Sequence, residues 1–263
     1  MPTTTSSVLT ERLYVSRESR IHGLPAHVKI LVVLGSVVAI VATPPTAVWA
    51  FLLYFVLVRL LLLAAHIPFR TVAPRLLVEL PFVVFALLLP VFGTGPRVSV
   101  GPVTLSEAGL WAAWGLLAKA TLGVMLSVIL ASTTSTADFV NGLQRLRLPE
   151  VLVQMTAAMV RYVNVVVDEW HRMSRAREAR GFEARGPRAW PMLGRSLGAL
   201  FIRAYERGER VHLAMLARGY SGRMPELDSR ATVPLATWLA AASVPVCFAV
   251  VAVLANMLGG LGG

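Results

Sequence analysis

The sequence predicts an all-α integral membrane protein, with about five transmembrane helices and two long cytoplasmic helices. Of its 263 residues, 56% are hydrophobic and only 15% are charged, whereas a soluble domain carries roughly 25% charged residues. The apolar residues gather in five long segments, and most of the net charge gathers in one block between the fourth and the fifth. This composition excludes disorder, which requires low hydrophobicity, and argues against an ordinary soluble enzyme.

The five apolar segments have the length of membrane-spanning helices. They cover residues 28–42, 46–65, 76–92, 108–131 and 231–258. A helix rises 1.5 Å per residue, so each segment crosses or nearly crosses a hydrocarbon core of about 30 Å. We therefore expect a bundle of about four helices in residues 28–131, and a final transmembrane helix with a short tail in residues 231–263.

The charge pattern predicts the orientation of these helices. The net charge is +11, and residues 145–230 hold 16 Arg and nine acidic residues, which is +7 of that total. Cytoplasmic loops of membrane proteins are enriched in Lys and Arg. We therefore expect a multi-pass protein of the cell membrane, with the N-terminal segment 1–27 and the block 132–230 in the cytoplasm.

Besides Lys29 at the start of the first segment, three ionisable residues lie within the apolar segments, where an unpaired charge is costly. Arg59 and Glu79 lie near the expected inner ends, and we expect their side chains to extend to the interface. Lys119 lies in the middle of its segment. It indicates either a contact with another helix or a partner or, as the simpler alternative, an ion pair within the bundle.

The cytoplasmic block predicts three helices. Apolar residues at a spacing of three to four predict an amphipathic helix over residues 138–148. Pro149 suits the first turn of the next helix, and the pattern stays helical over residues 150–180, with an apolar first half and a charged second half. A third helix is expected over residues 194–218, after a connection that includes Pro191.

The second and third of these helices end alike. The segment from Arg172 to Phe182 aligns with the segment from Arg210 to Tyr220 at a constant offset of 38 residues. Each contains Ala-Arg-Gly followed by an aromatic residue. The tripeptide alone is weak evidence, because a cation and a glycine are ordinary at a helix C-terminus; another copy at 184–186 lacks the long preceding helix. Two extended copies at the ends of two long helices indicate docking onto two copies of one partner.

The sequence lacks the patterns of common enzyme classes. It contains no P-loop and no Gly-x-Ser-x-Gly elbow. Asp168 and Glu169 are adjacent, so a helix directs them about 100° apart, and no second acidic cluster of this kind accompanies them. The five His are scattered, and the single Cys247 excludes a multi-cysteine metal site. We expect no catalytic residue, no metal site and no cofactor in this chain.

Two other classes of protein stay open at this point. A membrane-anchored lipid or nucleic-acid binding protein would use the Arg-rich helices as a basic face, although interleaved acidic residues argue against one strong basic stripe. The permease of an ordinary ABC importer has one short coupling loop per chain, which fits two long helices less well. Salt dependence of binding would test the first alternative, and subunit stoichiometry would test the second.

These segments resemble the transmembrane T component of energy-coupling factor (ECF) transporters, in the CbiQ-like cobalt branch. Residues 16–29 are similar to the segment that precedes the first span in that family. Residues 143–149, followed by residues 159–162, are similar to the stretch that opens the first coupling helix. Residues 206–220 are similar to the second coupling helix. The resemblance therefore covers nearly the whole chain.

The resemblance implies that two Ala-Arg-Gly motifs bind two ABC-type ATPase subunits. Carried over to this chain, the binding residues are Ala179, Arg180, Gly181, Ala217, Arg218 and Gly219. It also implies that the chain catalyses no reaction. The partner ATPases would bind ATP and Mg²⁺, and a separate membrane subunit would bind the substrate, which is a metal ion such as cobalt or nickel, or a vitamin. The lipid bilayer is an expected partner and nucleic acid is not.

Overall fold

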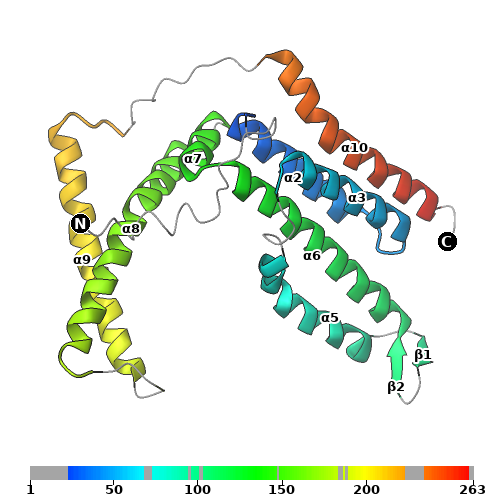
Figure 1. Ribbon diagram of the computed structural model, residues 1–263, viewed down its shortest axis with the longest axis horizontal. Helices are drawn as coiled ribbons and strands as arrows, with labels where there is room; N and C mark the ends of the chain where they lie inside the picture. Colours follow the sequence, from blue (N-terminus) through cyan, green and yellow to red (C-terminus); the bar gives the residue numbers. More distant parts are fainter. Residues whose placement is uncertain are drawn as a thin grey trace. The chain divides into compact units, whose positions relative to one another are not determined.

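The computed structural model describes residues 23–67, 73–93, 96–100, 103–146, 148–182, 186, 189–222 and 234–260, and most of these residues are helical. Figure 1 shows the elements along the chain. Contacts divide the chain into two compact units. The first, called the helical bundle below, comprises the described residues up to 142 and those from 234 onward. The second, called the helix pair, comprises the described residues from 143 to 222.

All five apolar segments of the sequence form helices of the bundle. These are α2 (Ala26–Ala42), α3 (Val48–Ala64), the 3₁₀ helix η2 (Ala73–Glu79) with α5 (Leu80–Phe92), α6 (Glu107–Thr133) and α10 (Leu235–Gly260). Helix α2 packs against α10 and α6, α3 packs against α6, and α5 lies along α6. The expected segments therefore match the observed helices to within a few residues at each end.

The third apolar segment differs from the expectation, because it does not begin as an α-helix. It begins as the 3₁₀ helix η2, and the α-helix starts at Leu80. Pro81 occupies the first turn of α5, where the missing N–H of proline has no consequence. Because Pro81 has no N–H to donate to the carbonyl four residues earlier, an α-helix cannot continue through it from the preceding turn, and the regular α-helix begins at Leu80.

A small β-hairpin interrupts the otherwise helical bundle, in a connection for which the sequence analysis predicted no regular structure. Strands β1 (Arg97–Val100) and β2 (Val103–Ser106) pair antiparallel, with Arg97 opposite Ser106. Ser106 then begins α6, because its Oγ accepts a hydrogen bond from the Gly109 N–H at 3.3 Å. At Gly109 a Cβ would lie 2.5 Å from the Leu89 carbonyl oxygen, so a glycine there permits α5 and α6 to approach closely.

The core of the bundle centres on Tyr54, which has no exposed surface. Its ring stacks on Phe248 of α10 with centroids 5.1 Å apart. Its hydroxyl lies 2.9 Å from the Thr43 Oγ1 and donates to the Phe248 carbonyl at 3.1 Å. A buried hydroxyl needs such partners, because leaving it unpaired costs free energy. Tyr54 thereby joins α3, the end of α2 and α10.

The two lysines of the chain link α2 and α6 reciprocally. Lys29, at the start of α2, donates to the Thr133 carbonyl at the end of α6 at 2.7 Å. Lys119 of α6 donates to the Val41 carbonyl at the end of α2 at 2.8 Å. The last carbonyls of a helix lack partners within the helix and carry partial negative charge. Lys119 therefore makes a helix–helix contact, and no ion pair of Lys119 is found among the described residues.

Glu79 does not extend to an interface, so that expectation is wrong. Its side chain is buried at the junction of η2 and α5, and its Oε2 accepts a hydrogen bond from the Thr121 hydroxyl of α6 at 2.9 Å. The carboxyl therefore faces the neighbouring helix of the bundle. Arg59 of α3 is half-buried.

Helix α7 (Thr136–Arg145) follows α6 after a short break. The Ser135 Oγ accepts a hydrogen bond from the Asp138 N–H at 3.1 Å and caps the first turn. At Gly142 a Cβ would lie 3.0 Å from the Ala26 Cβ, so α7 lies close against α2. The helix expected over residues 138–148 is thus present, shifted by two to three residues.

The helix pair consists of α8 (Glu150–Glu178) and α9 (Trp190–Ala217). The second of these starts earlier than expected. Pro191 belongs to its first turn rather than to the connection before it. Proline is favoured at this position because the first N–H groups of a helix have no intrahelical acceptor.

Three helices of the described chain are long and apolar enough to cross a membrane by length and composition: α6, α8 and α10. Shorter apolar helices cover Ala26–Ala42, Val48–Ala64 and Leu77–Phe92. Helix α8 is apolar enough because of its first half, whereas its second half carries the charged run that starts at Asp168. The N-terminal residues 1–22, which include most of the expected cytoplasmic segment, lie outside the described part.

Candidate functional site

The first motif forms the end of α8. Gly181 has φ +75°, which a residue with a side chain rarely adopts. The Gly181 N–H donates to the Glu178 carbonyl at 2.9 Å, and the Phe182 N–H donates to the Arg177 carbonyl at 3.1 Å. This pair of hydrogen bonds defines a Schellman motif, which ends a helix and satisfies its last carbonyls.

The second motif forms the end of α9 with the same geometry. Gly219 has φ +83°. The Gly219 N–H donates to the Leu216 carbonyl and the Tyr220 N–H to the Met215 carbonyl, each at 3.0 Å. All donors and acceptors are offset by 38 residues from those of the first motif. The structure thus extends the alignment from residue types to hydrogen bonds.

The six residues proposed for partner binding are all exposed. They are Ala179, Arg180, Gly181, Ala217, Arg218 and Gly219. The aromatic residues that follow, Phe182 and Tyr220, are half-buried. Within the described part of the chain the side chains of Arg180 and Arg218 show no hydrogen bond and no ion pair, so both guanidinium groups are available to carboxylates or carbonyls of another protein. Arg185, the alternative copy, lies outside the described residues.

The two motifs lie at opposite ends of the helix pair. The Gln154 Nε2, near the start of α8, donates to the Gly222 carbonyl beyond the end of α9 at 2.8 Å. The two helices are therefore antiparallel, and Gly181 lies at the far end of α8 from this contact (Figure 1). From Gln154 to Gly181 the helix rises on the order of 40 Å at 1.5 Å per residue. This separation allows two partner molecules to bind one at each end.

A polar cluster joins α8 and α9 near their crossing. The Glu169 carboxylate accepts hydrogen bonds from Arg172 of α8 at 2.8 Å and from Arg203 of α9. These two arginines, Arg172 foremost, hold the pKa of Glu169 below its usual value. Arg177 lies over the Trp170 ring at 5.0 Å. A cavity of about 410 Å³ with several arginines opens beside this cluster toward the first motif.

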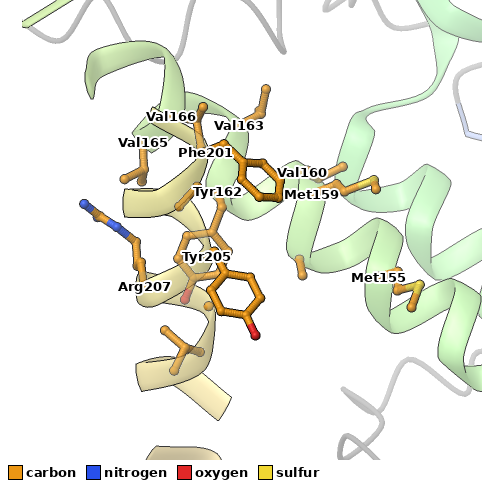
Figure 2. A pocket seen from close by; sticks show the side chains of 14 residues that line it. Met155, Met159, Val160, Tyr162, Val163, Val165, Val166, Phe201, Tyr205 and Arg207 are labelled. Atoms are coloured by element: carbon orange, nitrogen blue, oxygen red, sulfur yellow. The ribbon is translucent and has the colours of Figure 1, made fainter. Parts of the chain in front are cut away.

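An apolar groove of about 1220 Å³ lies between the first half of α8 and the second half of α9 (Figure 2). Met155 and Met159 come from α8, and Phe201 and Tyr205 come from α9; their exposed fractions are 55%, 71%, 71% and 66%. The rest of the α8 wall is lined by Ala158, Val160, Tyr162, Val163, Val165 and Val166. So many exposed apolar side chains in one place indicate an interaction surface. Methionine suits such a surface, because its side chain adapts to different partners.

Sequence reasoning found part of this groove. It predicted the apolar first half of α8, which forms one wall of the groove. Packing within the chain does not account for Met155 and Met159, because both are exposed. It missed Phe201 and Tyr205, although their spacing of four residues places them on one face of a helix.

No group of three or more His, Cys, Asp or Glu that could hold a metal ion is present in the described part of the chain. The buried Glu79 carboxylate accepts a hydrogen bond from Thr121. The Glu169 carboxylate pairs with Arg172 and Arg203. The arrangement presents two exposed arginine tips and an apolar groove, which are features of protein–protein contact.

Comparison with known proteins adds independent information. The sequence model of the family described as "Cobalt transport protein", CbiQ, matches residues 17–227. The cobalt transport protein CbiQ of Rhodobacter capsulatus is 28% identical over 216 residues, which are 82% of this chain and 86% of that protein. The ECF transporter transmembrane protein EcfT of Listeria innocua is 26% identical over 224 residues, which are 80% and 83% of the two chains. An uncharacterized protein of Methanocaldococcus jannaschii is 28% identical over 187 residues, covering 68% and 69%.

Proposed function

The chain belongs to the CbiQ family of cobalt transport proteins, so it is a transmembrane transporter component and not an enzyme, and we propose that it couples two ATPase subunits to a substrate-binding membrane subunit in an ECF-type importer. The observation that carries this proposal is the pair of matching helix ends. Two exposed Ala-Arg-Gly tips with the same hydrogen bonds lie at opposite ends of one antiparallel helix pair. One chain thereby offers two equivalent binding sites.

The two tips would bind the ATPases through their arginines. Arg180 and Arg218 each follow an exposed alanine and precede a glycine with positive φ. The small alanine leaves space for a partner, and the arginine fork binds carboxylates or backbone carbonyls. ATP and Mg²⁺ would be held by the ATPases, and this chain would need no cofactor of its own.

The apolar groove would bind the substrate-binding subunit. Its walls come from both helices of the pair, so a change in the angle between α8 and α9 changes its shape. ATP binding would draw the two ATPases together and move the tips, and the groove would transmit this movement to the seated subunit. An interface with an apolar core and polar rim is the usual form of such contacts.

The bundle would span the membrane, with the helix pair on the cytoplasmic side. The charged second half of α8 and the Arg-rich block support this orientation through the positive-inside rule. In this arrangement the cell membrane holds α2, α3, α5, α6 and α10. The apolar half of α8 would then contact a protein partner in place of lipid. The substrate would be a metal ion, with cobalt as the first candidate because the family description names cobalt transport.

Uptake by the reconstituted complex tests the proposal. The chain is co-expressed with its ATPases and its substrate-binding subunit, and the complex is reconstituted into proteoliposomes. Cobalt and nickel uptake is then measured in separate experiments with ATP supplied inside or outside the vesicles. The double variant Arg180→Glu/Arg218→Glu should lose uptake while its bundle unfolds at the wild-type temperature. Arg195→Glu, an exposed arginine of α9 with no described partner, serves as the matched control and should keep uptake. Normal uptake by the double variant would refute the proposal.

A further inference from the structure

The two motifs share their backbone geometry but differ in one functional group. The first ends in Phe182 and the second in Tyr220. The Tyr220 hydroxyl is engaged, since it donates to the Gln154 Oε1 on α8. The Tyr220 ring also contacts His212 of α9 edge-to-face, with centroids 6.5 Å apart. The aromatic residue of the second motif therefore contacts both helices of the pair, and a phenylalanine could not make the hydroxyl contact.

The Gln154 amide is held on both sides by the segment that follows α9. Its oxygen accepts from Tyr220, and its nitrogen donates to the Gly222 carbonyl at 2.8 Å. Two hydrogen bonds thus join residues 220–222 to the second turn of α8. Because two bonds with opposite direction use one planar amide, they fix the position of that turn more tightly than either bond would alone.

This junction lies directly beside the apolar groove. Gln154 precedes Met155, the first groove residue of α8. Tyr220 follows the Arg218-Gly219 tip without an intervening residue. Near the opposite end of the groove Glu169 contacts Arg203, and these two residues lie beside the groove residues Val166 and Ala204. The groove therefore lies between two polar contacts, and the first of them is made by the residue next to a binding tip.

We propose that Tyr220 and Gln154 are positioning residues that transmit movement of the second tip directly to the groove wall of α8, a role that the first motif lacks. This inference rests on the proposed function. A force on the Arg218-Gly219 tip reaches the start of α8 through the two bonds of Gln154. At the first tip the corresponding side chain, Phe182, has no hydrogen-bonding group. The two ATPases would accordingly act unequally on the substrate-binding subunit.

The test removes one hydroxyl. Tyr220→Phe gives the second motif the aromatic residue of the first, and Gln154→Met keeps the size of the side chain without its amide. Each is assembled with both ATPases and the substrate-binding subunit in proteoliposomes, and the amount of substrate transported per ATP hydrolysed is measured. We expect Tyr220→Phe to lower this ratio about two- to tenfold, which corresponds to the net contribution of one hydrogen bond. Gln154→Met removes both hydrogen bonds of the amide and should lower the ratio at least as much.

The control and the double variant make the test specific. Gln144→Met changes an exposed glutamine of α7 and should keep the wild-type ratio. Tyr220→Phe/Gln154→Met should lower the ratio no further than Gln154→Met alone, because Gln154→Met already removes the contact that Tyr220→Phe removes. A wild-type ratio in both single variants, or additive losses, would overturn the inference. Failure of the wild-type chain to assemble with ATPases would instead refute the proposed function, so the two failures are distinguishable.

Discussion

The helical bundle and the helix pair use apolar side chains in different ways. In the bundle, Tyr54 and Phe248 are fully covered by neighbouring helices. In the helix pair, Phe201 and Tyr205 lie largely exposed along a groove, and polar contacts such as that of Glu169 with Arg203 join the helices. The bundle is therefore stabilised by its own core. The helix pair presents apolar surface that a partner would complete, which suits a part that changes shape.

The largest expected difference between the two units concerns aromatic truncation. Tyr54→Ala removes a fully buried ring and leaves the hydroxyl of Thr43 without that partner. We expect it to lower the free energy of unfolding by about 3–5 kcal/mol. Phe201→Ala changes an exposed side chain and should alter that free energy by less than about 0.5 kcal/mol. Unfolding of the chain in mixed micelles measures both, and equal losses would contradict the comparison.

A smaller effect is expected at the reciprocal lysine contacts. Lys29→Met removes the buried hydrogen bond to the Thr133 carbonyl and leaves the end of α6 without it. A hydrogen bond to a charged group contributes about 1.5–3 kcal/mol, so the bundle should unfold at lower denaturant concentration. Arg195→Met, at an exposed position of α9, is the control from the helix pair. An unchanged midpoint for Lys29→Met would show that this contact does not stabilise the bundle.

Replacing glycine with alanine should have opposite effects on stability at the end and in the interior of α9. Gly219→Ala places a side chain at φ +83° and should destabilise the end of α9 by about 1–2 kcal/mol. Gly198→Ala lies inside α9, where a Cβ meets nothing within 4 Å, and should stabilise the helix by about 0.5–1 kcal/mol. Amide hydrogen exchange in α9 measures both changes. Effects of the same sign would be inconsistent with the described helix end.

The smallest effect concerns the pH dependence of the helix crossing. The pKa of Glu169 is lowered by its hydrogen bonds to Arg172 and Arg203. A lowered pKa stabilises the folded contact fully above the unfolded value of about 4.5, and this contribution is lost as pH falls through the lower folded pKa. Spin labels on α8 and α9 should report a constant distance from neutral pH down to about pH 5 and a looser crossing below about pH 4.5. Glu169→Gln should abolish this dependence; a persisting dependence would assign it to another group.

Much of the fold follows from local sequence patterns. Hydropathy locates the apolar helices of the bundle because each is a long apolar run, and glycine after a charged turn locates both helix ends, Gly181 and Gly219. The β-hairpin was missed because its strands have four residues each and lie among Gly and Pro. Pro191 was placed in a connection because proline is common between helices. It also suits the first turn of a helix, and that is where it lies.

The contacts that organise each unit could not be predicted, because they join residues far apart in sequence. Lys29 meets Thr133 across 104 residues, and Gln154 meets Tyr220 across 66. The motif predicts that Arg180 and Arg218 are accessible. It does not predict that Tyr220, unlike Phe182, makes a hydrogen bond to the other helix of the pair. Periodicity predicts the exposed face of a helix, whereas only packing shows that Met159 and Phe201 line the same groove.

The central claim is that one chain binds two ATPases through two equivalent tips, and native mass spectrometry of the purified complex tests it most directly. We predict two ATPase subunits per copy of the wild-type chain, one when either Arg180→Glu or Arg218→Glu is present, and none when both are present. A wild-type chain that purifies without ATPases, or a double variant that keeps both, would contradict the account.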